Sequence, residues 1–483
     1  MGGFKFKTKP YEHQLQALEA SWQKEEYALL MDMGTGKSKV LIDTIAYLDR
    51  KDLINSVIIL APKGVYKNWV GKEIPAHMPD STKHKVAYWA SPLSKKHKDS
   101  IKEIWRPDNN LHIFVMNIEA LSTGKAEEVA TKFVSSHGGR TLIAIDESTV
   151  IKNHKARRTK AAIRVAKRCA YKRILTGSPI TKTPLDLFAQ FQFLGEDLLG
   201  FKSFYAFTTR YADVIKRSAA GGSHQYNQIL GFRNLDELTE LIKPHSYRVT
   251  KEECLDLPEK TYTMRSIELT AEQKAMYNQM KKTAVALLDN MEMVTANAVI
   301  TQLLRLHQIS CGFVNTDDGN IIRFKNNRMS ELLSILEEVS GKVIIWANYR
   351  HDIMAIELEL ARVYGPKTVA TYFGDTDGEE RQNIVDRFQE TDELRFFVGQ
   401  PRTGGYGLTL TAASTVIYYS NSYDLEVRLQ SEDRAHRIGQ SNAVTYIDII
   451  AQKTVDEKIV SALRRKINIA TQVLEEDWKK WLI

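Results

Sequence analysis

The strongest sign of chemistry in the sequence is a short glycine-rich segment, Met-Gly-Thr-Gly-Lys-Ser at residues 33–38. It lies between an apolar stretch and an amphipathic helical pattern, a strand–loop–helix setting in which backbone N–H groups can close on phosphates. There Lys37 would reach the β- and γ-phosphates, and the Ser38 hydroxyl could hold Mg²⁺. Met31 stands where the full P-loop pattern has its first glycine, so a glycine-rich turn that caps a core helix stays an alternative. The residues predicted to bind nucleotide here are Gly34, Thr35, Gly36, Lys37 and Ser38.

A pair of adjacent carboxylates, Asp146 and Glu147, ends the apolar run at 141–146. An acid at the carboxyl end of a buried strand can hold Mg²⁺, and its neighbour can orient an attacking water. Taken alone, such a pair is commonly a solvated turn or a helix cap. Because it follows the glycine-rich segment by about 110 residues on a parallel-sheet pattern, we interpret it as a Walker B element, with Asp146 as the metal ligand.

Two arginines near the carboxyl end, Arg434 and Arg437, lie three residues apart and so share one face of a helix. A guanidinium stabilises the γ-phosphate during phosphoryl transfer when a second domain supplies it. The segment alone favours a simpler interpretation, a surface helix with salt bridges to Glu432 or Asp433.

The elements that must position these residues follow an alternating pattern. Short β-branched runs alternate with amphipathic stretches of helix length in two separate series, which predicts an α/β fold with two parallel-sheet domains. Residues from about 184 to 338 instead carry long helical patterns, which we interpret as helical insertions. The runs lie at 56–60, 111–117, 141–146 and 172–177, and then at 342–347, 368–373, 394–399, 414–419 and 444–450.

Composition narrows the class of protein. The 483 residues predict about three domains of roughly 150 residues, or two larger ones with insertions. Lys and Arg exceed Asp and Glu by 67 to 59, a net charge of +8 that favours a polyanionic partner. Three scattered cysteines fit neither a disulfide framework nor a zinc site. No apolar run reaches the ~18 residues of a membrane span, so we expect an intracellular protein with no membrane partner.

Together the motifs resemble, in order from Tyr11 to Lys458, those of superfamily 2 helicases of the Swi/Snf type, the DNA-translocating ATPases. In motif II, Ser148 and Thr149 replace the usual small residue and the His that commonly helps to couple the two lobes. In motif V, Thr409 stands where many members have Asn. The matching segments are the Q motif (10–14), motif I (32–38), Ia (60–73), Ib (116–121), II (146–153), III (175–180), IV (342–353), V (403–420) and VI (430–440).

The resemblance implies a fold of two tandem RecA-like parallel-sheet domains with helical insertions, and ATP and Mg²⁺ as cofactors. Lobe 1, the helicase ATP-binding domain, would span 1–246 with a helical insertion at about 184–245. Lobe 2, the helicase C-terminal domain, would span 247–483, with a linker at about 247–262 and a helical insertion at about 271–312.

The resemblance also assigns roles to single residues. The implied catalytic residues are Lys37, Asp146, Glu147, Arg434 and Arg437, with Ser38 and Asp146 as metal ligands. The implied nucleotide contacts outside motif I are Gln14, in the place that reads adenine, and Gly405 and Gly407 of motif V. The implied nucleic-acid contacts are Lys63, Asn117, Lys152, Asn153, Arg350, Thr376 and Thr403.

The expected activity is that of a DNA-dependent ATPase that moves along double-stranded DNA, with a monomer as the working unit. The ten Lys and Arg residues from Lys152 to Arg173, with no acid among them, favour a phosphate backbone as partner. Two alternatives stay open: a strand-separating helicase on RNA or single-stranded DNA, and a DNA clamp that binds nucleotide without hydrolysing it. We expect a cytoplasmic protein at the nucleoid of a prokaryotic or viral host, or a nuclear one in a eukaryote.

Overall fold

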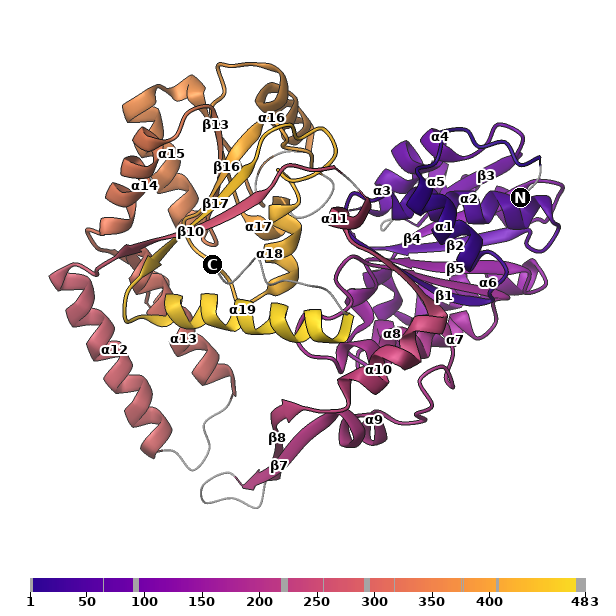
Figure 1. The fold of residues 1–483 in the computed structure, drawn as a ribbon, viewed down its shortest axis with the longest axis horizontal. Coiled ribbons are helices and arrows are strands. Elements are labelled where there is room, and N and C mark those ends of the chain that lie inside the picture. Colours follow the sequence, from indigo (N-terminus) through magenta and orange to yellow (C-terminus); the bar gives the residue numbers. More distant parts are fainter. Residues whose placement is uncertain are drawn as a thin grey trace. The chain divides into compact units, whose positions relative to one another are not determined.

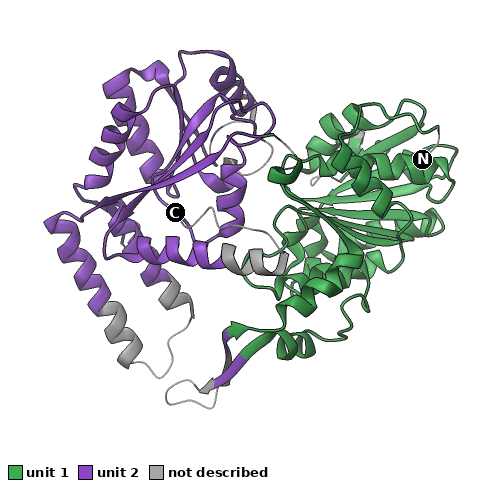
Figure 2. Cartoon of the chain, viewed as in Figure 1, with its two compact units in different colours: residues 1–213, 231–256, 469–476 green, residues 214–230, 257–468, 477–483 purple. Residues whose placement is uncertain are grey.

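A computed structural model describes residues 3–63, 65–89, 95–218, 225–254, 256–290, 296–316, 318–374, 376, 378–404 and 408–474. The chain divides into two compact units, shown in separate colours in Figure 2. Unit 1 comprises residues 1–213, 231–256 and 469–476, and unit 2 comprises 214–230, 257–468 and 477–483. Among the described residues, no helix has the length and apolar composition that crossing a membrane requires.

Unit 1 is built on a seven-stranded sheet with the order β3-β4-β2-β5-β6-β1-β9, in which every neighbouring pair is parallel. The central strands β2 and β5 are buried at every position, which explains why they appear in the sequence as unbroken apolar runs. The strands are β1 (Glu26–Met31), β2 (Ser56–Ala61), β3 (His84–Tyr88), β4 (Leu111–Asn117), β5 (Thr141–Asp146), β6 (Tyr171–Leu175) and β9 (Ser246–Val249).

Helices cover both faces of this sheet, whereas α9 lies beside β7 (Ala212–Ser218) and β8 (Gln225–Phe232) (Figure 1). The helices of unit 1 are α1 (Glu12–Ser21), α2 (Lys37–Arg50), α3 (Tyr66–Asn68), α4 (Ile74–His77), α5 (Lys95–Ile104), α6 (Gly124–Ser136), α7 (Arg157–Ala166), α8 (Asp186–Leu194), α9 (Phe204–Tyr211), α10 (Leu235–Ile242) and α11 (Lys251–Cys254). Shorter turns are the π-helix η1 (Trp69–Glu73) and the 3₁₀ turns η2 (Ile118–Ser122), η3 (Ser148–Ile151) and η4 (Lys243–His245).

Unit 2 has its own six-stranded sheet with the order β10-β17-β16-β13-β15-β14, again parallel throughout. The two sheets confirm the predicted α/β class and its two parallel-sheet domains. The strands are β10 (Lys260–Ile267), β13 (Lys342–Trp346), β14 (Val369–Tyr372), β15 (Phe396–Gly399), β16 (Ala413–Tyr418) and β17 (Val444–Ala451), with a small antiparallel pair β11 (Phe313–Asn315) and β12 (Ile321–Arg323).

Two helices of unit 2 begin at side-chain caps: Asn326 and Asp424 accept N–H groups in the first turns of α14 and α18. The helices are α12 (Ala271–Asn290), α13 (Ala296–Cys311), α14 (Asn327–Glu338), α15 (Arg350–Tyr364), α16 (Gly378–Glu390), α17 (Pro401–Gly404), α18 (Leu425–Glu432) and α19 (Val455–Leu474), of which residues 455–468 are assigned to unit 2, with the 3₁₀ turn η5 (Pro366–Thr368).

The structure differs from the sequence prediction in two connecting regions. The insertion expected to be helical at about 184–245 contains, besides α8, α9 and α10, the two-stranded sheet of β7 (Ala212–Ser218) and β8 (Gln225–Phe232). The expected linker at about 247–262 is not one connecting segment, because β9 pairs with β1 in the sheet of unit 1 and Lys260 begins β10 of unit 2. The predicted lobe limits at 246 and 247 stay a prediction.

A buried ion pair ties the start of α19 to the core of unit 2. The Arg328 guanidinium, fully buried, donates to Asp456 and to the carbonyl oxygen of Ile449. The Ser310 hydroxyl also donates to Asp456, at 2.9 Å. Burial by itself would raise the pKa of Asp456, but the charges of Arg328 and His307 hold it below the ordinary value. The carboxylate is therefore charged in the folded unit.

Asp456→Asn should lower the free energy of unfolding of unit 2 by about 3–5 kcal/mol at neutral pH, because it leaves the Arg328 charge buried without its partner. A lowered carboxyl pKa contributes stability above the ordinary pKa, and that contribution is lost as the pH falls through the folded value. The difference between the two proteins should therefore shrink below about pH 4. Hydrogen exchange of the β13 and β17 amides measures the free energy of unfolding of unit 2. The control is Glu457→Gln, because Glu457 is exposed. An equal loss of stability in both variants would contradict the role of the ion pair.

Candidate active site

Three neighbouring strands of unit 1 end at one edge of the sheet, and two of them, β1 and β5, lead to predicted nucleotide residues. In the order β5-β6-β1, β1 runs into the glycine-rich segment, β5 ends at Asp146, and β6 runs into motif III. Because all three strands are parallel, their carboxyl ends meet at the same edge. Ligands of open α/β sheets bind outside the carboxyl ends of strands, so this edge is the candidate active site.

The glycine-rich loop adopts a conformation that other residues resist. Gly34 and Gly36 have φ angles of 83° and 92°, in the left-handed region. A Cβ atom on Gly36 would also lie 2.2 Å from Nε2 of Gln14. Helix α2 begins at the next residue, Lys37, with Ser38 second. The loop therefore places the amino-terminal end of a 14-residue helix at the site, the arrangement that attracts phosphate.

Lys37 is held against the loop that precedes it. Its ammonium donates to the carbonyl oxygens of Met31 and Asp32 at 2.8 and 3.0 Å, and the side chain is buried. The predicted role of Lys37 requires phosphate oxygens to replace these two carbonyl acceptors.

Gln14, predicted to read adenine, fastens α1 to the same loop. Its Nε2 donates to the carbonyl oxygen of Thr35 at 3.0 Å, and its Oε1 accepts the Tyr11 N–H at 3.1 Å. His13 makes a second contact with the Thr35 carbonyl oxygen, at 2.8 Å. The side chain of Gln14 therefore links the start of α1 to the glycine-rich loop through two hydrogen bonds.

Asp146 is a buried carboxylate with identifiable partners. The Trp69 indole Nε1–H donates to its Oδ2 at 2.9 Å. Burial raises the pKa of Asp146 above the ordinary value, while the Trp69 hydrogen bond, the Lys37 charge and the Glu147 N–H each act to lower it. The positive charge of Lys37 therefore favours the ionised form of the Asp146 carboxylate.

The donor set at this edge fits Mg²⁺. In the described part of the chain, no three His, Cys, Asp or Glu side chains gather as a metal cluster. Mg²⁺ commonly takes only one or two protein oxygens and completes its octahedron with phosphate and water. The Asp146 carboxylate and the Ser38 hydroxyl are hard oxygen donors of that kind, so these two residues would hold the ion.

Glu147 sits in a strained backbone conformation. Its φ and ψ angles are 52° and 62°, the left-handed region that is uncommon for a residue with a Cβ atom. Strain of this kind gathers at functional sites, where the surrounding structure imposes it. Strand β5 and the turn η3, which flank the residue, hold it in place.

Motif II is bridged to motif III through a glutamine that the sequence analysis did not assign. The Ser148 hydroxyl donates to Oε1 of Gln190 at 2.7 Å, and Nε2 of Gln190 donates to the Pro179 carbonyl oxygen at 2.8 Å. Ser148 and Gln190 are fully buried. The hydroxyl that replaces the usual small residue of motif II therefore makes a contact of its own.

Arg248, in β9, is a second residue that the motifs did not identify. Its guanidinium donates to the carbonyl oxygens of Leu30 and Gly177 and contacts Oδ1 of Asp32 at 3.1 Å. The N–H of Lys251 donates to the other oxygen of Asp32 at 3.1 Å. The chain that leaves unit 1 is thus fixed to the residues that enter the glycine-rich loop.

In unit 2, the predicted arginines of motif VI lie against motif V. Nη1 of Arg434 and Nη1 of Arg437 both donate to the carbonyl oxygen of Leu408, at 3.2 and 3.1 Å. Arg434 is buried and Arg437 is half-buried. The predicted nucleotide contacts Gly405 and Gly407 lie outside the described residues.

Within unit 1, the predicted nucleic-acid contacts follow three adjacent strands of the order β4-β2-β5. Asn117 ends β4 and accepts the Ala120 N–H at 2.8 Å, which caps η2. Lys63 follows β2 with its side chain exposed, whereas Lys152, after β5, donates to the Thr181 hydroxyl at 2.6 Å. Asn153, also after β5, is exposed. All four therefore lie along the edge that carries the candidate active site.

The three predicted contacts of unit 2 follow its adjacent strands β13, β15 and β14 in the same way. Arg350 begins α15 after β13 and lies over the Phe373 ring at 5.6 Å. Thr403 follows β15 and donates to Gln400, and Thr376 follows β14 and accepts the Phe373 N–H. Each unit thus brings its predicted contacts to the carboxyl edge of its own sheet.

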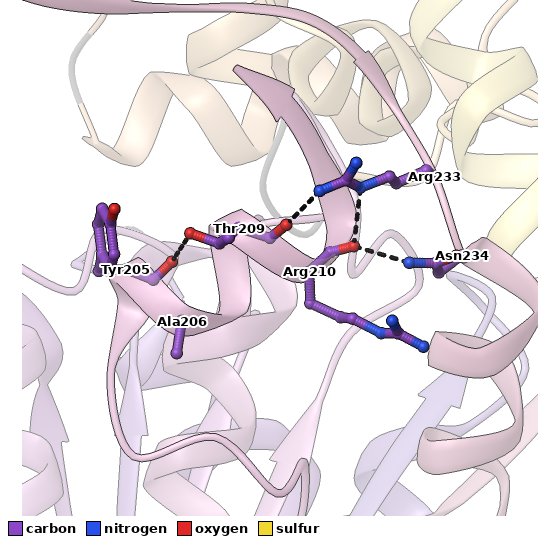
Figure 3. A pocket seen from close by; sticks show the side chains of 6 residues that line it. All are labelled: Tyr205, Ala206, Thr209, Arg210, Arg233 and Asn234. Atoms are coloured by element: carbon purple, nitrogen blue, oxygen red, sulfur yellow. Dashed lines mark hydrogen bonds between the residues drawn. The ribbon is translucent and has the colours of Figure 1, made fainter. Parts of the chain in front are cut away.

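A pocket of about 700 Å³ lies elsewhere in unit 1, beside α9 (Figure 3). Its polar groups already bind one another: Arg233 donates to the Thr209 carbonyl oxygen, Asn234 donates to that of Arg210, and Arg210 is paired with Glu237. We interpret these contacts as the attachment of the end of β8 to α9. The candidate nucleotide site is therefore the sheet edge and not this pocket.

A glycine loop at a helix amino terminus, beside paired carboxylates at a strand end, is the arrangement of P-loop nucleoside triphosphatases. The sequence matches the SNF2-related domain over residues 13–313 and the helicase conserved C-terminal domain over residues 325–439. The chain therefore belongs to the SNF2-related family, which confirms the predicted Swi/Snf-type resemblance.

Curated relatives share about a quarter of the residues. YwqA of Bacillus subtilis, named as an ATP-dependent helicase/translocase, is 27% identical over 460 residues, covering 92% of this chain and 46% of its own length. The ATP-dependent helicase brm of Drosophila melanogaster is 25% identical over 501 residues, covering 96% of this chain and 29% of its own. The chain thus spans less than half the length of these relatives.

Among solved structures, the Sulfolobus solfataricus SWI2/SNF2 ATPase core in complex with dsDNA is similar. It shares 22% identity, covers 100% of this chain and 97% of its own, and gives a TM-score of 0.43.

Glu147→Gly should give a protein more stable than Glu147→Ala by about 1 kcal/mol, because both remove the carboxylate but only glycine adopts the left-handed conformation without strain. At Ser148, where φ is not positive, the order should reverse, with the Gly variant less stable than the Ala variant. Urea unfolding of the four variants measures both differences. Equal stability of the two Glu147 variants would show that the strain is absent.

Proposed function

We propose that the chain is an ATP-dependent double-stranded DNA translocase, in which hydrolysis of Mg²⁺-bound ATP drives movement along the duplex. The observation that carries the proposal is the single sheet edge of unit 1, where the predicted nucleotide residues after β1 and at the end of β5 share the edge with the predicted phosphate-backbone contacts after β4, β2 and β5. Membership of the SNF2-related family supports it, as do relatives named as ATP-dependent helicases and translocases.

The residues of the site divide the reaction among them. The loop N–H groups and Lys37 bind the β- and γ-phosphates and balance their charge. Asp146 and Ser38 hold Mg²⁺, which when bound neutralises charge on the phosphate oxygens. Glu147 orients the attacking water and accepts its proton. We propose that Arg434 and Arg437 exchange the Leu408 carbonyl oxygen for the γ-phosphate during turnover.

Grip on the duplex is proposed to be independent of base sequence. The predicted contacts are Lys and Arg side chains and short polar side chains at strand ends, which are suited to phosphates. The basic stretch from Lys152 to Arg173 is not uniform, because Arg173 is fully buried and donates to four backbone carbonyl oxygens. Its exposed residues directly after motif II, Lys155, Arg157 and Lys160, supply the usable charge.

ATP hydrolysis should be stimulated strongly by duplex DNA, and more weakly by single-stranded DNA or RNA. Affinity for DNA should fall as salt rises, by about 0.9 log units per log unit of salt for each phosphate contact. Phosphate release with each nucleic acid measures the stimulation, and DNA binding at several salt concentrations measures the affinity. Glu147→Gln is the control for hydrolysis: it should bind ATP without turning it over, because the amide cannot accept the water's proton. Equal stimulation by RNA or single strands would favour the strand-separating helicase, and no release with any nucleic acid would favour the clamp.

Arg437→Ala should lower kcat about 10³-fold while nucleotide and DNA affinities change little, because an arginine that acts on the transferring phosphoryl group matters most in the transition state. Lys should rescue poorly, since a point charge cannot bridge two oxygens as a planar guanidinium does. The measurements are kcat, nucleotide Kd and DNA Kd, with the exposed Arg362→Ala as control. Normal turnover per folded Arg437→Ala molecule would return the residue to a structural role.

A further inference from the structure

A buried tryptophan in unit 1 makes a contact to which neither the motifs nor the proposed function gives a role. Trp69 lies within motif Ia and is 1% exposed. Its Nε1–H donates to Oδ2 of Asp146, the proposed metal ligand, at 2.9 Å. The residues are 77 positions apart in the sequence, so this hydrogen bond joins two separate motifs.

The segment that carries Trp69 is a continuous helical piece that starts beside a predicted DNA contact. The N–H groups of Val65 and Tyr66 donate to the Pro62 carbonyl oxygen, and α3, η1 and α4 then follow without a break. Trp69 opens η1, a π-helical turn of a kind that is rare and found frequently at functional sites. At the start of the segment, the backbone N–H of Lys63 donates to Glu119, which follows β4 in motif Ib.

The packing of the ring makes the hydrogen bond directional. Trp69 belongs to the hydrophobic cluster that fills one face of the sheet of unit 1. A ring packed in this way does not turn freely, so its N–H fixes the plane of the carboxylate that it binds. Outer-shell partners that orient a metal ligand in this manner commonly cost about 10- to 100-fold in metal affinity when they are removed.

We infer that Trp69 is a positioning residue with two effects. It holds the Asp146 carboxylate in the orientation that Mg²⁺–nucleotide requires, and it joins that carboxylate to the segment that starts at Lys63. A shift of this segment on DNA binding therefore reaches the metal ligand through one hydrogen bond. The inference rests on the proposed function, because it takes Asp146 as the metal ligand and Lys63 as a DNA contact.

The test is the Mg²⁺ concentration that half-saturates binding of a fluorescent, non-hydrolysable ATP analogue. Trp69→Phe keeps an aromatic ring and removes the N–H, and should raise this concentration at least about tenfold. Binding of the analogue in EDTA should stay unchanged. The matched control is Trp105→Phe in the same unit, because Nε1 of Trp105 is buried and has no hydrogen-bond partner among the described residues. This control should leave the Mg²⁺ requirement as it is.

The same titration with duplex DNA present tests the coupling. In the unmodified protein, saturating DNA should lower the half-saturating Mg²⁺ concentration, and in Trp69→Phe this DNA-dependent shift should disappear while DNA affinity is kept. Coupling between two ligands is reciprocal. The increase in DNA affinity that the Mg²⁺–analogue causes in the unmodified protein should therefore also disappear in Trp69→Phe. A shift that persists in Trp69→Phe overturns the coupling.

A packing defect is separated from loss of the N–H by a second variant. Replacing Trp69 with benzothienylalanine keeps the bicyclic shape and puts sulfur in place of the N–H group, so it should behave as Trp69→Phe does if the hydrogen bond is the cause. An unchanged Mg²⁺ requirement in this variant overturns the inference. If the unmodified protein shows no Mg²⁺-dependent binding of the analogue, the proposed function fails instead.

Discussion

The structure of unit 1 depends on one buried carboxylate, that of Asp146. Burial raises the pKa of this carboxyl group, and the Trp69 indole, the Lys37 ammonium and the Glu147 N–H only partly offset that effect. These partners come from three places: the helix after the glycine loop, the segment after β2, and the strand end itself. Burying a charge requires such partners, so the position of the carboxylate fixes the positions of the elements around it.

Strain and close packing hold the remaining parts of the site. Gly36 leaves room for Gln14 only because it has no Cβ atom, and Gln14 in turn ties α1 to the Thr35 carbonyl oxygen. Glu147 keeps a left-handed backbone between β5 and η3. The conformation of Glu147 is at odds with its local preference, and proteins sustain such strain where the surrounding fold imposes it.

Sequence patterns predicted the strands that are buried on both faces, because such strands form unbroken apolar runs. All nine predicted runs form strands, whereas β3, β9 and β10, which lie toward or at the ends of their sheets and have partly exposed residues, were missed. The predicted site residues of motifs I and II share one sheet edge, as parallel strands require. Trp69, Gln190 and Arg248 could not be assigned, because their contacts join segments far apart in the sequence and follow no spacing rule.

In each unit, the predicted residues lie at the carboxyl edge of its own sheet, but the kinds of residue differ between the two units. In unit 1, strand ends carry both the glycine loop with its carboxylates and the predicted DNA contacts. In unit 2, strand ends carry predicted DNA contacts, and the motif VI arginines rest on the Leu408 carbonyl oxygen. A carbonyl oxygen is a weaker partner for a guanidinium than a phosphate, because only the phosphate carries a full charge. Motif V therefore positions both arginines on a neutral acceptor, and the proposed exchange of that acceptor for a phosphate would strengthen their hydrogen bonds.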